Sequence, residues 1–359
     1  GALDREPLEA FAERLGVGGR HLRRLFDEHL GVSPAAVAQT HRTHFARQLV
    51  ESTDLAMTEI AHAAGFASVR RFNGAVRTAF GLSPTEIRSR ASSPSRGIVL
   101  RLPFRPPYDW DAMLGFLAPR AIPGVERIAD GVYERTIPGA TVVVTRDGDR
   151  HLRLEVRAAR AKDVDLFGVV ARVRRLFDLD SDPAPIAAHL RRDPVLAALV
   201  KKRPGLRVPG AWEPLEIAVR AILGQQVTVA GATTLATRLV DRIGNGRFPD
   251  ARTLAKADVA SIGLPPVRAE AIRAVARLAD HELEDPEKLL AIHGIGPWTA
   301  AYVAMRASRD PDALPASDLG LKRALGLETA RAIEQRAEAW RPWRSYAVMH
   351  LWCGEEKQR

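Results

Sequence analysis

The sequence predicts a mostly helical α+β protein whose three segments run in the order helical, mixed and helical. Short helical patterns fill residues 5–90, period-2 strands follow, and helical periodicity returns from residue 186 to the end. The Ser/Pro/Gly run at residues 91–97 has the composition of a linker. We therefore expect domains at residues 1–90, 98–180 and 181–359, within the two or three that a chain of 359 residues allows.

Composition limits the classes of function. Lys and Arg exceed Asp and Glu by 53 to 43, and the net charge of +10 favours a polyanionic partner, although a solvated Arg-rich surface explains it equally well. The single Cys353 excludes an intramolecular disulfide and a Cys-rich metal site. Without a long apolar segment or a signal peptide, we expect a cytoplasmic protein; the first residue is Gly, which suggests trimming from a longer chain.

The middle segment contains one clear hairpin. HLRLEVR alternates the apolar Leu152, Leu154 and Val156 with polar residues, which is the period of a half-buried strand. TVVVT, at residues 141–145, is the expected partner strand, and RDGDR supplies the turn.

The first segment carries two helix-turn-helix patterns. In GVGGRHLRRLFDEHLG, the apolar residues share one helix face and leave Arg23 and Arg24 on another, as a recognition helix requires. In GFASVRRFNGAV, Ser68 can cap a helix that presents Arg70, Arg71 and Asn73. The bland alternative is a small helical bundle with a solvated Arg face.

Residues 5–90, with GFASVRRFN and FGLSPTEIR, resemble the AraC-type double helix-turn-helix module, and most of all that of the Ada regulators. The resemblance implies that Arg23, Arg24, Ser68, Arg70, Arg71 and Asn73 contact DNA. Gly18 and Gly19 replace the usual capping hydroxyl, so we expect a less firmly started first recognition helix. The methyl-accepting Cys domain that precedes this module in Ada is absent from the sequence, so we do not expect phosphotriester repair by this chain.

The sharpest motif is DPEKLLAIHGIGPWTAAYVAM. Asp285 can cap one helix, Gly294 and Gly296 permit a tight hairpin, and Pro297 can start the next helix at its preferred first position. This helix-hairpin-helix aims backbone N–H groups at a DNA phosphate, a contact that does not depend on base sequence.

A carboxylate and two aromatic residues follow the hairpin. Trp298 and Tyr302 lie four residues apart and share one helix face, so they can line a pocket together. Asp318, in ALPASDLGLKRAL, stands at the start of a further helix, where the helix dipole favours negative charge. Each residue alone is more often a core aromatic or a simple helix cap, and only their coincidence after a hairpin indicates a site.

These features resemble the helix-hairpin-helix DNA glycosylase superfamily. Within it, GIGPWTAAY, RAILGQQV and WRPWRSYAVMHLW, with PPYDWDAMLGFLAPRAIPGVE upstream, resemble the 3-methyladenine DNA glycosylase II (AlkA) family over residues 98–355. The resemblance implies a TATA-binding-protein-like mixed domain before the glycosylase domain. It also assigns the site: catalytic Asp318; a base pocket of Phe116, Trp298, Tyr302 and Trp352; phosphate contacts at Gly294, Gly296 and Thr299; and monovalent-cation ligands in the carbonyls of Leu290, Ile292 and Ile295.

One position departs from the family. Its apolar wedge, a Leu that fills the gap left by the flipped base, is replaced here by Gln226. A Gln can fill the gap and hydrogen-bond the orphaned partner base, so we expect base flipping to persist with changed local preferences.

The resemblance implies a monofunctional glycosylase that hydrolyses the N-glycosidic bond of alkylated bases in double-stranded DNA. Bifunctional relatives place a Lys where this chain has Trp298, so we expect no lyase activity. We expect no required cofactor beyond a possible Na or K ion at the hairpin, and a monomer at the bacterial nucleoid. Two alternatives remain open: a transcription regulator whose glycosylase-like half only senses damage, and an enzyme for uracil or oxidised bases.

Overall fold

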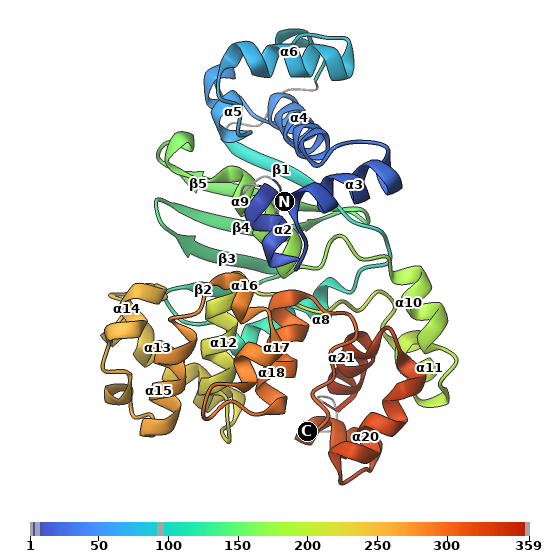
Figure 1. Cartoon of the computed structure of the whole chain (residues 1–359), viewed down its shortest axis with the longest axis vertical. Coiled ribbons are helices and arrows are strands. Elements are labelled where there is room, and N and C mark those ends of the chain that lie inside the picture. The colour runs from blue at the N-terminus through green and yellow to red at the C-terminus, as the bar shows by residue number, and fades with distance from the viewer. Residues whose placement is uncertain (1–2, 4–7, 92–96, 356–359) are drawn as a thin grey trace. The chain divides into compact units, whose positions relative to one another are not determined.

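The computed structural model describes residue 3 and residues 8–91 and 97–355 (Figure 1). Most of the expected linker, residues 92–96, lies outside the described residues. The chain divides into two compact units. Unit 1 comprises Gly1–Arg101, Ile137–Val143 and Arg153–Ala171, and unit 2 comprises Leu102–Thr136, Val144–Leu152 and Arg172–Arg359.

The first segment forms the predicted helices around a small core. Leu49, Ile60, Phe72 and Val76 are completely buried in it. The helices are α2 (Leu8–Arg14), α3 (Gly19–Leu30), α4 (Pro34–Ser52), α5 (Met57–Ala63), α6 (Val69–Phe80) and α7 (Pro84–Arg90). The two helix-turn-helix patterns are thereby confirmed as helical elements of this segment.

The two predicted recognition helices, α3 and α6, begin differently. Ser68 caps α6, and its hydroxyl accepts a hydrogen bond from Arg71 N at 3.3 Å. Gly18 precedes α3 without any side-chain cap, as the sequence predicts. A capping hydroxyl contributes about 1 kcal/mol over Ala and only a few tenths over Gly, so the difference between the two starts is small.

The mixed segment forms a five-stranded sheet with the order β1-β5-β4-β3-β2. Its strands are β1 (Ile98–Pro103), β2 (Glu126–Ala129), β3 (Val132–Ile137), β4 (Ala140–Asp147) and β5 (His151–Ala158). β2 and β3 are antiparallel, with Glu126 opposite Arg135. The predicted hairpin is confirmed as β4 and β5, and Leu152, Leu154 and Val156 are buried.

The remaining helices are short and numerous. They are α8 (Trp110–Leu117), η1 (Ala118–Arg120), η2 (Ala161–Asp163), α9 (Leu166–Leu176), α10 (Pro183–Leu190), α11 (Pro194–Lys202), α12 (Pro214–Leu223), α13 (Val229–Arg242), α14 (Ala251–Lys256), η3 (Val259–Ile262), α15 (Pro266–Val275), α16 (Asp280–Leu283), α17 (Pro286–Leu290), α18 (Pro297–Val303), the π-helix η4 (Ala304–Ser308), α19 (Leu319–Leu325), α20 (Ala330–Ala337), η5 (Glu338–Trp340) and α21 (Arg344–Glu355). Among the described residues, none of the helices is both long and apolar enough to span a membrane.

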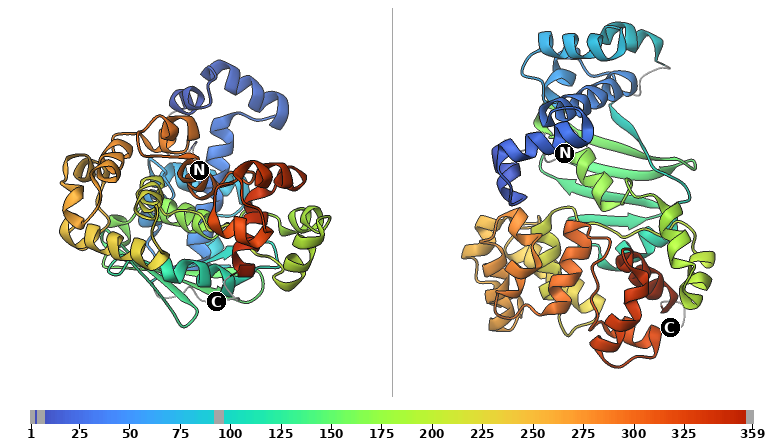
Figure 2. Two further views of the ribbon diagram at one scale, coloured as in Figure 1. Left: turned by 90° about the horizontal axis from the view of Figure 1, so that it is seen from below. Right: turned by 45° about the vertical axis from the view of Figure 1, so that its right-hand side comes forward.

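Within unit 2 the helices form two groups, as Figures 1 and 2 show. Helices α12 to α18 surround an apolar core that includes Val219, Ile272 and Val303. Helices α10 and α11 lie beside α19, α20 and α21. The hairpin belongs to the first group, whereas Asp318 and Trp352 belong to the second.

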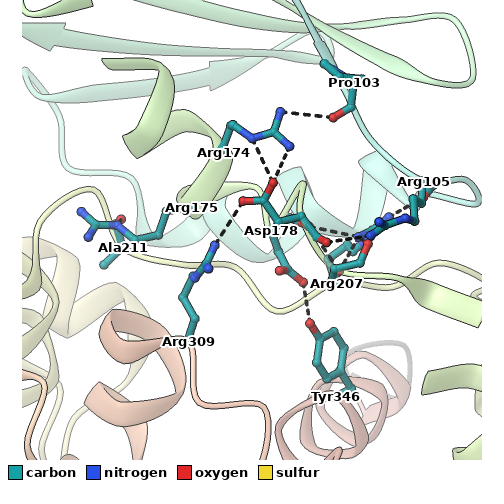
Figure 3. Close-up of polar contacts among 11 residues, drawn as sticks. Pro103, Arg105, Arg174, Arg175, Asp178, Arg207, Ala211, Arg309 and Tyr346 are labelled. Atoms are coloured by element: carbon teal, nitrogen blue, oxygen red, sulfur yellow. Dashed lines mark hydrogen bonds and ion pairs between the residues drawn. The ribbon is translucent and has the colours of Figure 1, made fainter. Parts of the chain in front are cut away.

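A buried polar network fixes α21 to the mixed region of unit 2 (Figure 3). The Tyr346 hydroxyl donates a hydrogen bond of 2.8 Å to the carboxylate of Asp178, and Arg207 donates to the Asp178 carbonyl at 3.0 Å and to the Arg105 carbonyl at 2.5 Å. Burial raises the pKa of Asp178 in spite of these cationic and hydroxyl neighbours. Because Trp352 lies on the same helix as Tyr346, the network also helps to position a predicted pocket residue.

The buried His350 of α21 makes stability depend on pH. Burial, with Arg203 nearby and opposed only by Asp109, lowers the pKa of His350 to about 4. The unfolded imidazole, with a pKa near 6.5, binds a proton more readily, so stability is complete above that value and declines as the pH falls toward 4. We expect a loss of about 3 kcal/mol in the free energy of unfolding over this range.

Urea unfolding at several pH values measures this loss. The matched variant His350→Gln has no titrating group at this position, so its stability should decline less steeply between pH about 6.5 and 4. Equal slopes in the two proteins would show that His350 is not the titrating group.

Candidate active site

Asp318 occupies the start of helix α19. Its Oδ1 accepts hydrogen bonds from Leu321 N at 3.0 Å and from Trp352 Nε1 at 2.9 Å, and its Oδ2 accepts one from Trp298 Nε1 at 2.9 Å. The residue is half-buried. Three N–H donors thus fix the orientation of the carboxylate between two indole rings, one from each helix group of unit 2.

The four predicted pocket aromatics lie together. Trp298 and Tyr302 stack with ring centroids 5.2 Å apart, and Phe116 stacks on Trp352 at 6.2 Å. Tyr302 and Trp352 connect the two pairs at 6.3 Å. The structure therefore places residues 116, 298, 302 and 352 in one continuous aromatic cluster around the carboxylate of Asp318.

Gly320 lies close against this arrangement. A Cβ at this position would lie 3.0 Å from Asp318 Oδ1 and 3.2 Å from Trp352 Cδ1. A side chain there would require the carboxylate or the indole to shift by a few tenths of an ångström. The first turn of α19 therefore packs tightly next to the acid that it positions.

Arg306 is a site residue that we did not predict. It lies in the π-helix η4, where its Nη1 donates to the Tyr302 hydroxyl at 2.6 Å and its other nitrogens donate to the carbonyls of Pro209 and Gly210. Its guanidinium also lies 5.1 Å from the centre of the Phe116 ring. The spacing of four residues from Tyr302 was the signal in the sequence, because residues so spaced share a helix face.

Two further arginines adjoin the cluster. The Arg120 guanidinium stacks over Phe116 at 3.8 Å. Arg120, Arg220 and Arg306 line a cavity of about 30 Å³, into which Glu126 and Glu216 also project. Burial acts to raise the pKa of Tyr302, but the charges of Arg306, Arg120 and Arg220 outweigh it and lower that pKa. The faces of Phe116 and Tyr302 are thus partly occupied by cations of the protein.

The hairpin has the predicted geometry. Gly294 has φ +90°, which L side chains rarely adopt, and a Cβ there would lie 3.0 Å from Val267. Pro297 is the first residue of α18, and the first-turn N–H groups of a helix have no partner within that helix. Thr299 is only 2% exposed and its hydroxyl accepts a hydrogen bond from Gln225, and its backbone N–H belongs to this first turn.

The hairpin carbonyls are compatible with a monovalent cation. Leu290 ends α17, where carbonyls lack partners within the helix. The Ile292 carbonyl accepts from Ile295 N at 3.1 Å and keeps a second lone pair. In the part of the chain that the structure describes, His, Cys, Asp and Glu nowhere form a cluster that could hold a metal ion.

The predicted wedge residue stands at the tip of a loop. Gln226 is exposed and has φ +57°, a left-handed conformation that is uncommon for residues other than glycine. Residues 224–228, which we call the wedge loop, connect α12 to α13, and Thr228 caps α13. The side chain of Gln226 is therefore available to enter DNA.

The predicted helix-turn-helix contacts lie on exposed surfaces of α3 and α6. Arg70, Arg71 and Asn73 are exposed, as are Arg23 and Arg24. Arg23 donates to the Glu9 carboxylate at 2.6 Å and Arg24 contacts the His21 ring at 2.9 Å. A phosphate that binds Arg23 would have to compete with Glu9. The Ser68 hydroxyl already serves as the cap of α6.

Family models match most of the chain. A model described as "Helix-turn-helix domain" matches residues 11–90, "AlkA N-terminal domain" matches residues 99–213, and "HhH-GPD superfamily base excision DNA repair protein" matches residues 219–343. With the fold described above, these matches define the class: a helix-hairpin-helix DNA glycosylase with an AraC-type module, as predicted.

Two relatives specify the family. The chain is 42% identical to the "Probable bifunctional transcriptional activator/DNA repair enzyme AlkA" of Mycobacterium tuberculosis, over 98% of this chain and 77% of the relative. It is 36% identical to "DNA-3-methyladenine glycosylase 2" of Escherichia coli, over 71% of this chain and 96% of the relative. The chain belongs to the AlkA family of DNA glycosylases.

Solved structures share the fold. A 3-methyladenine DNA glycosylase from Archaeoglobus fulgidus superposes with a TM-score of 0.62 at 22% identity, covering 70% of this chain and 96% of that one. An 8-oxoguanine glycosylase/lyase from Clostridium acetobutylicum, in complex with duplex DNA, gives 0.57 at 17% identity, covering 70% and 93%. At these identities the likeness concerns the fold alone.

The effect of the arginines on the pKa of Tyr302 can be tested. Arg306→Gln should raise the pKa of Tyr302, because one of the three charges that stabilise the phenolate is removed while burial continues to oppose it. Alkaline difference absorbance of tyrosinate, with Tyr302→Phe as the reference, measures this pKa. The matched Arg306→Lys keeps the charge and should keep the lowered value; an unchanged pKa in Arg306→Gln would exclude Arg306 as the cause.

Proposed function

We propose that this chain flips N-alkylated purines out of duplex DNA and hydrolyses their N-glycosidic bond with Asp318 as the catalytic carboxylate. The observation that carries the proposal is the orientation of Asp318, whose two oxygens are held by indole N–H groups of two pocket aromatics. The names of the relatives support 3-methyladenine as a substrate. Extruding a base costs a few kcal/mol, and less for a damaged base.

Recognition would combine stacking with charge. Trp298 and Trp352 can stack on a flipped base, and a cationic alkylpurine gains about 0.5 to 2 kcal/mol over such a face. Phe116 contributes less to this preference than the sequence suggests, because Arg120 and Arg306 already lie over its ring. The positive charge of the lesion is then met mainly by the carboxylate of Asp318.

The chemical step follows from this arrangement. As the bond between C1′ and the base nitrogen breaks, its electron pair leaves with the base and the sugar becomes oxocarbenium-like. Asp318 stabilises that developing positive charge, and water attacks C1′ and releases a proton to the solvent. An alkylated purine leaves as a neutral base, so a strong general acid is unnecessary. Trp298 occupies the position of the lyase Lys, so no Schiff base and no strand cleavage follow.

Binding to DNA would use three surfaces. The N–H groups at the start of α18, made accessible by Gly294 and Gly296, bind a phosphate. A Na or K ion held by the carbonyls of Leu290, Ile292 and Ile295 would add positive charge at that phosphate. Gln226 fills the gap that the flipped base leaves, and the helix-turn-helix module raises the local concentration of the enzyme on DNA.

Asp318→Asn should lower single-turnover release of alkylated purines by roughly 100-fold or more, because transition-state charge is no longer stabilised. Affinity for duplex DNA should change little. Asp241→Asn, an exposed acid-to-amide change on α13, is the matched control. Full activity of Asp318→Asn on methylated DNA would remove the catalytic assignment.

The same assay separates the alternatives when methylated, uracil-containing and oxidised duplexes are compared. Release of uracil or oxidised bases without alkylpurines would favour an enzyme for those bases, and specific promoter binding without any release would favour the regulator. Strand cleavage without alkali treatment would contradict the absence of lyase activity.

A separate experiment addresses the helix-turn-helix module in the full chain. Replacing Arg70 and Arg71 together by Ala should weaken duplex binding and reduce the slope of log affinity against log salt by roughly 1 to 2, since each phosphate contact contributes about 0.9. The excision rate on a short methylated duplex at saturating enzyme should be unchanged. Arg191 and Arg192, an exposed pair in unit 2, provide the control with equal charge loss; equal effects of both pairs would show that only net charge matters.

A further inference from the structure

The wedge loop is tied to the hairpin by one side chain. Gln225 Nε2 donates to the Gly294 carbonyl at 3.0 Å and to Thr299 Oγ1 at 3.0 Å. A carbonyl oxygen can only accept, which fixes the amide nitrogen rather than the oxygen on this side. Gln225 thus joins the wedge loop to the turn of the hairpin and to the helix that follows it.

A third element holds the same residue. Arg268 Nη1, from the first turn of α15, donates to the Gln225 carbonyl at 2.8 Å. The wedge loop is therefore held through its side chain by the hairpin and through its backbone by α15. These bonds surround the residue directly before the predicted wedge.

The conformation of Gln226 explains why such support is needed. Its φ of +57° is a strained conformation for a residue other than glycine, and such strain persists only where the surroundings enforce it. The Gln226 side chain is exposed. Among the described residues, no hydrogen bond from outside the loop holds this side chain. The hydrogen bonds of Gln225 and Arg268 hold the loop in this conformation.

We propose that Gln225 is a positioning residue for base flipping, which fixes the wedge Gln226 at a set distance from the phosphate-binding hairpin. When the hairpin binds a phosphate, the tip of the wedge loop is carried into the duplex in register with that contact. The binding energy of a phosphate that carries no sequence information is thereby used to insert a side chain at one base step. The inference rests on the proposed function of Gln226 as the wedge.

The test compares Gln225→Met, Gln226→Ala and the double variant in the full chain. Met keeps the length of the side chain and lacks the donors. The probe is a short duplex with 2-aminopurine beside an abasic-site analogue, whose fluorescence reports unstacking, together with single-turnover release from methylated DNA. Binding is followed separately by anisotropy on undamaged duplex, and folding by the melting temperature.

Gln225→Met should bind undamaged duplex nearly as the wild type does, yet lose about 10- to 100-fold in excision rate together with the fluorescence change, since misplacement of about 1 Å is costly. The double variant should be no slower than Gln226→Ala, because a residue that acts only through the wedge has no effect once the wedge is absent. Multiplicative losses in the double variant, or a wild-type rate in Gln225→Met, would overturn the proposal.

Two controls keep the outcome decisive. If Gln225→Met fails to fold, Thr299→Val, which removes one acceptor at equal size, should show a smaller loss in the same direction; wild-type fluorescence and rate in that variant would also overturn the proposal. If the wild type itself releases no base, the proposed function fails. If the wild type and Gln225→Met unstack and excise the base equally well, only this inference is contradicted.

Discussion

The carboxylate of Asp318 connects two helix groups that the chain builds separately. One oxygen accepts from Trp298, in the hairpin group, and the other from Trp352, in the C-terminal group. Each indole therefore belongs to the aromatic cluster and also donates to the acid. Loss of either indole donor would remove one of the three hydrogen bonds that orient the carboxylate, and with it the link from one helix group to the acid.

Charge around this centre is distributed unevenly. Arg135 forms ion pairs with both Glu126 and Glu216, at 3.0 Å with the first, and so satisfies much of their acceptor capacity. Arg220 is left with a buried Nη1 that lacks a hydrogen-bond partner among the described residues, and burial lowers its pKa. The aromatic cluster therefore meets the cations of Arg120 and Arg306 at Phe116 and the carboxylate of Asp318 at its two indoles.

The sequence predicts the local elements well and the distant contacts poorly. The hairpin glycines, the Ser68 cap and the alternation of β5 are patterns within a few residues, and the structure contains each of them. The four aromatics and Asp318 were found because family motifs mark them. The partners of Gln225 and Arg306 lie 74 and 96 residues away, and no local pattern encodes such hydrogen bonds.

The π-helix η4 has a consequence for how this chain tolerates change in length. A π-turn holds one residue more than an α-turn, so α18 and η4 together behave as a helix with a single-residue insertion between Tyr302 and the end at Ser308. Deleting one residue between Tyr302 and Arg306 would reduce their spacing from four residues to three. In a regular α-helix this changes the angle between the two side chains by about 100°, which separates the guanidinium from the phenol. Such a change in length would therefore remove the cation that donates to the Tyr302 hydroxyl.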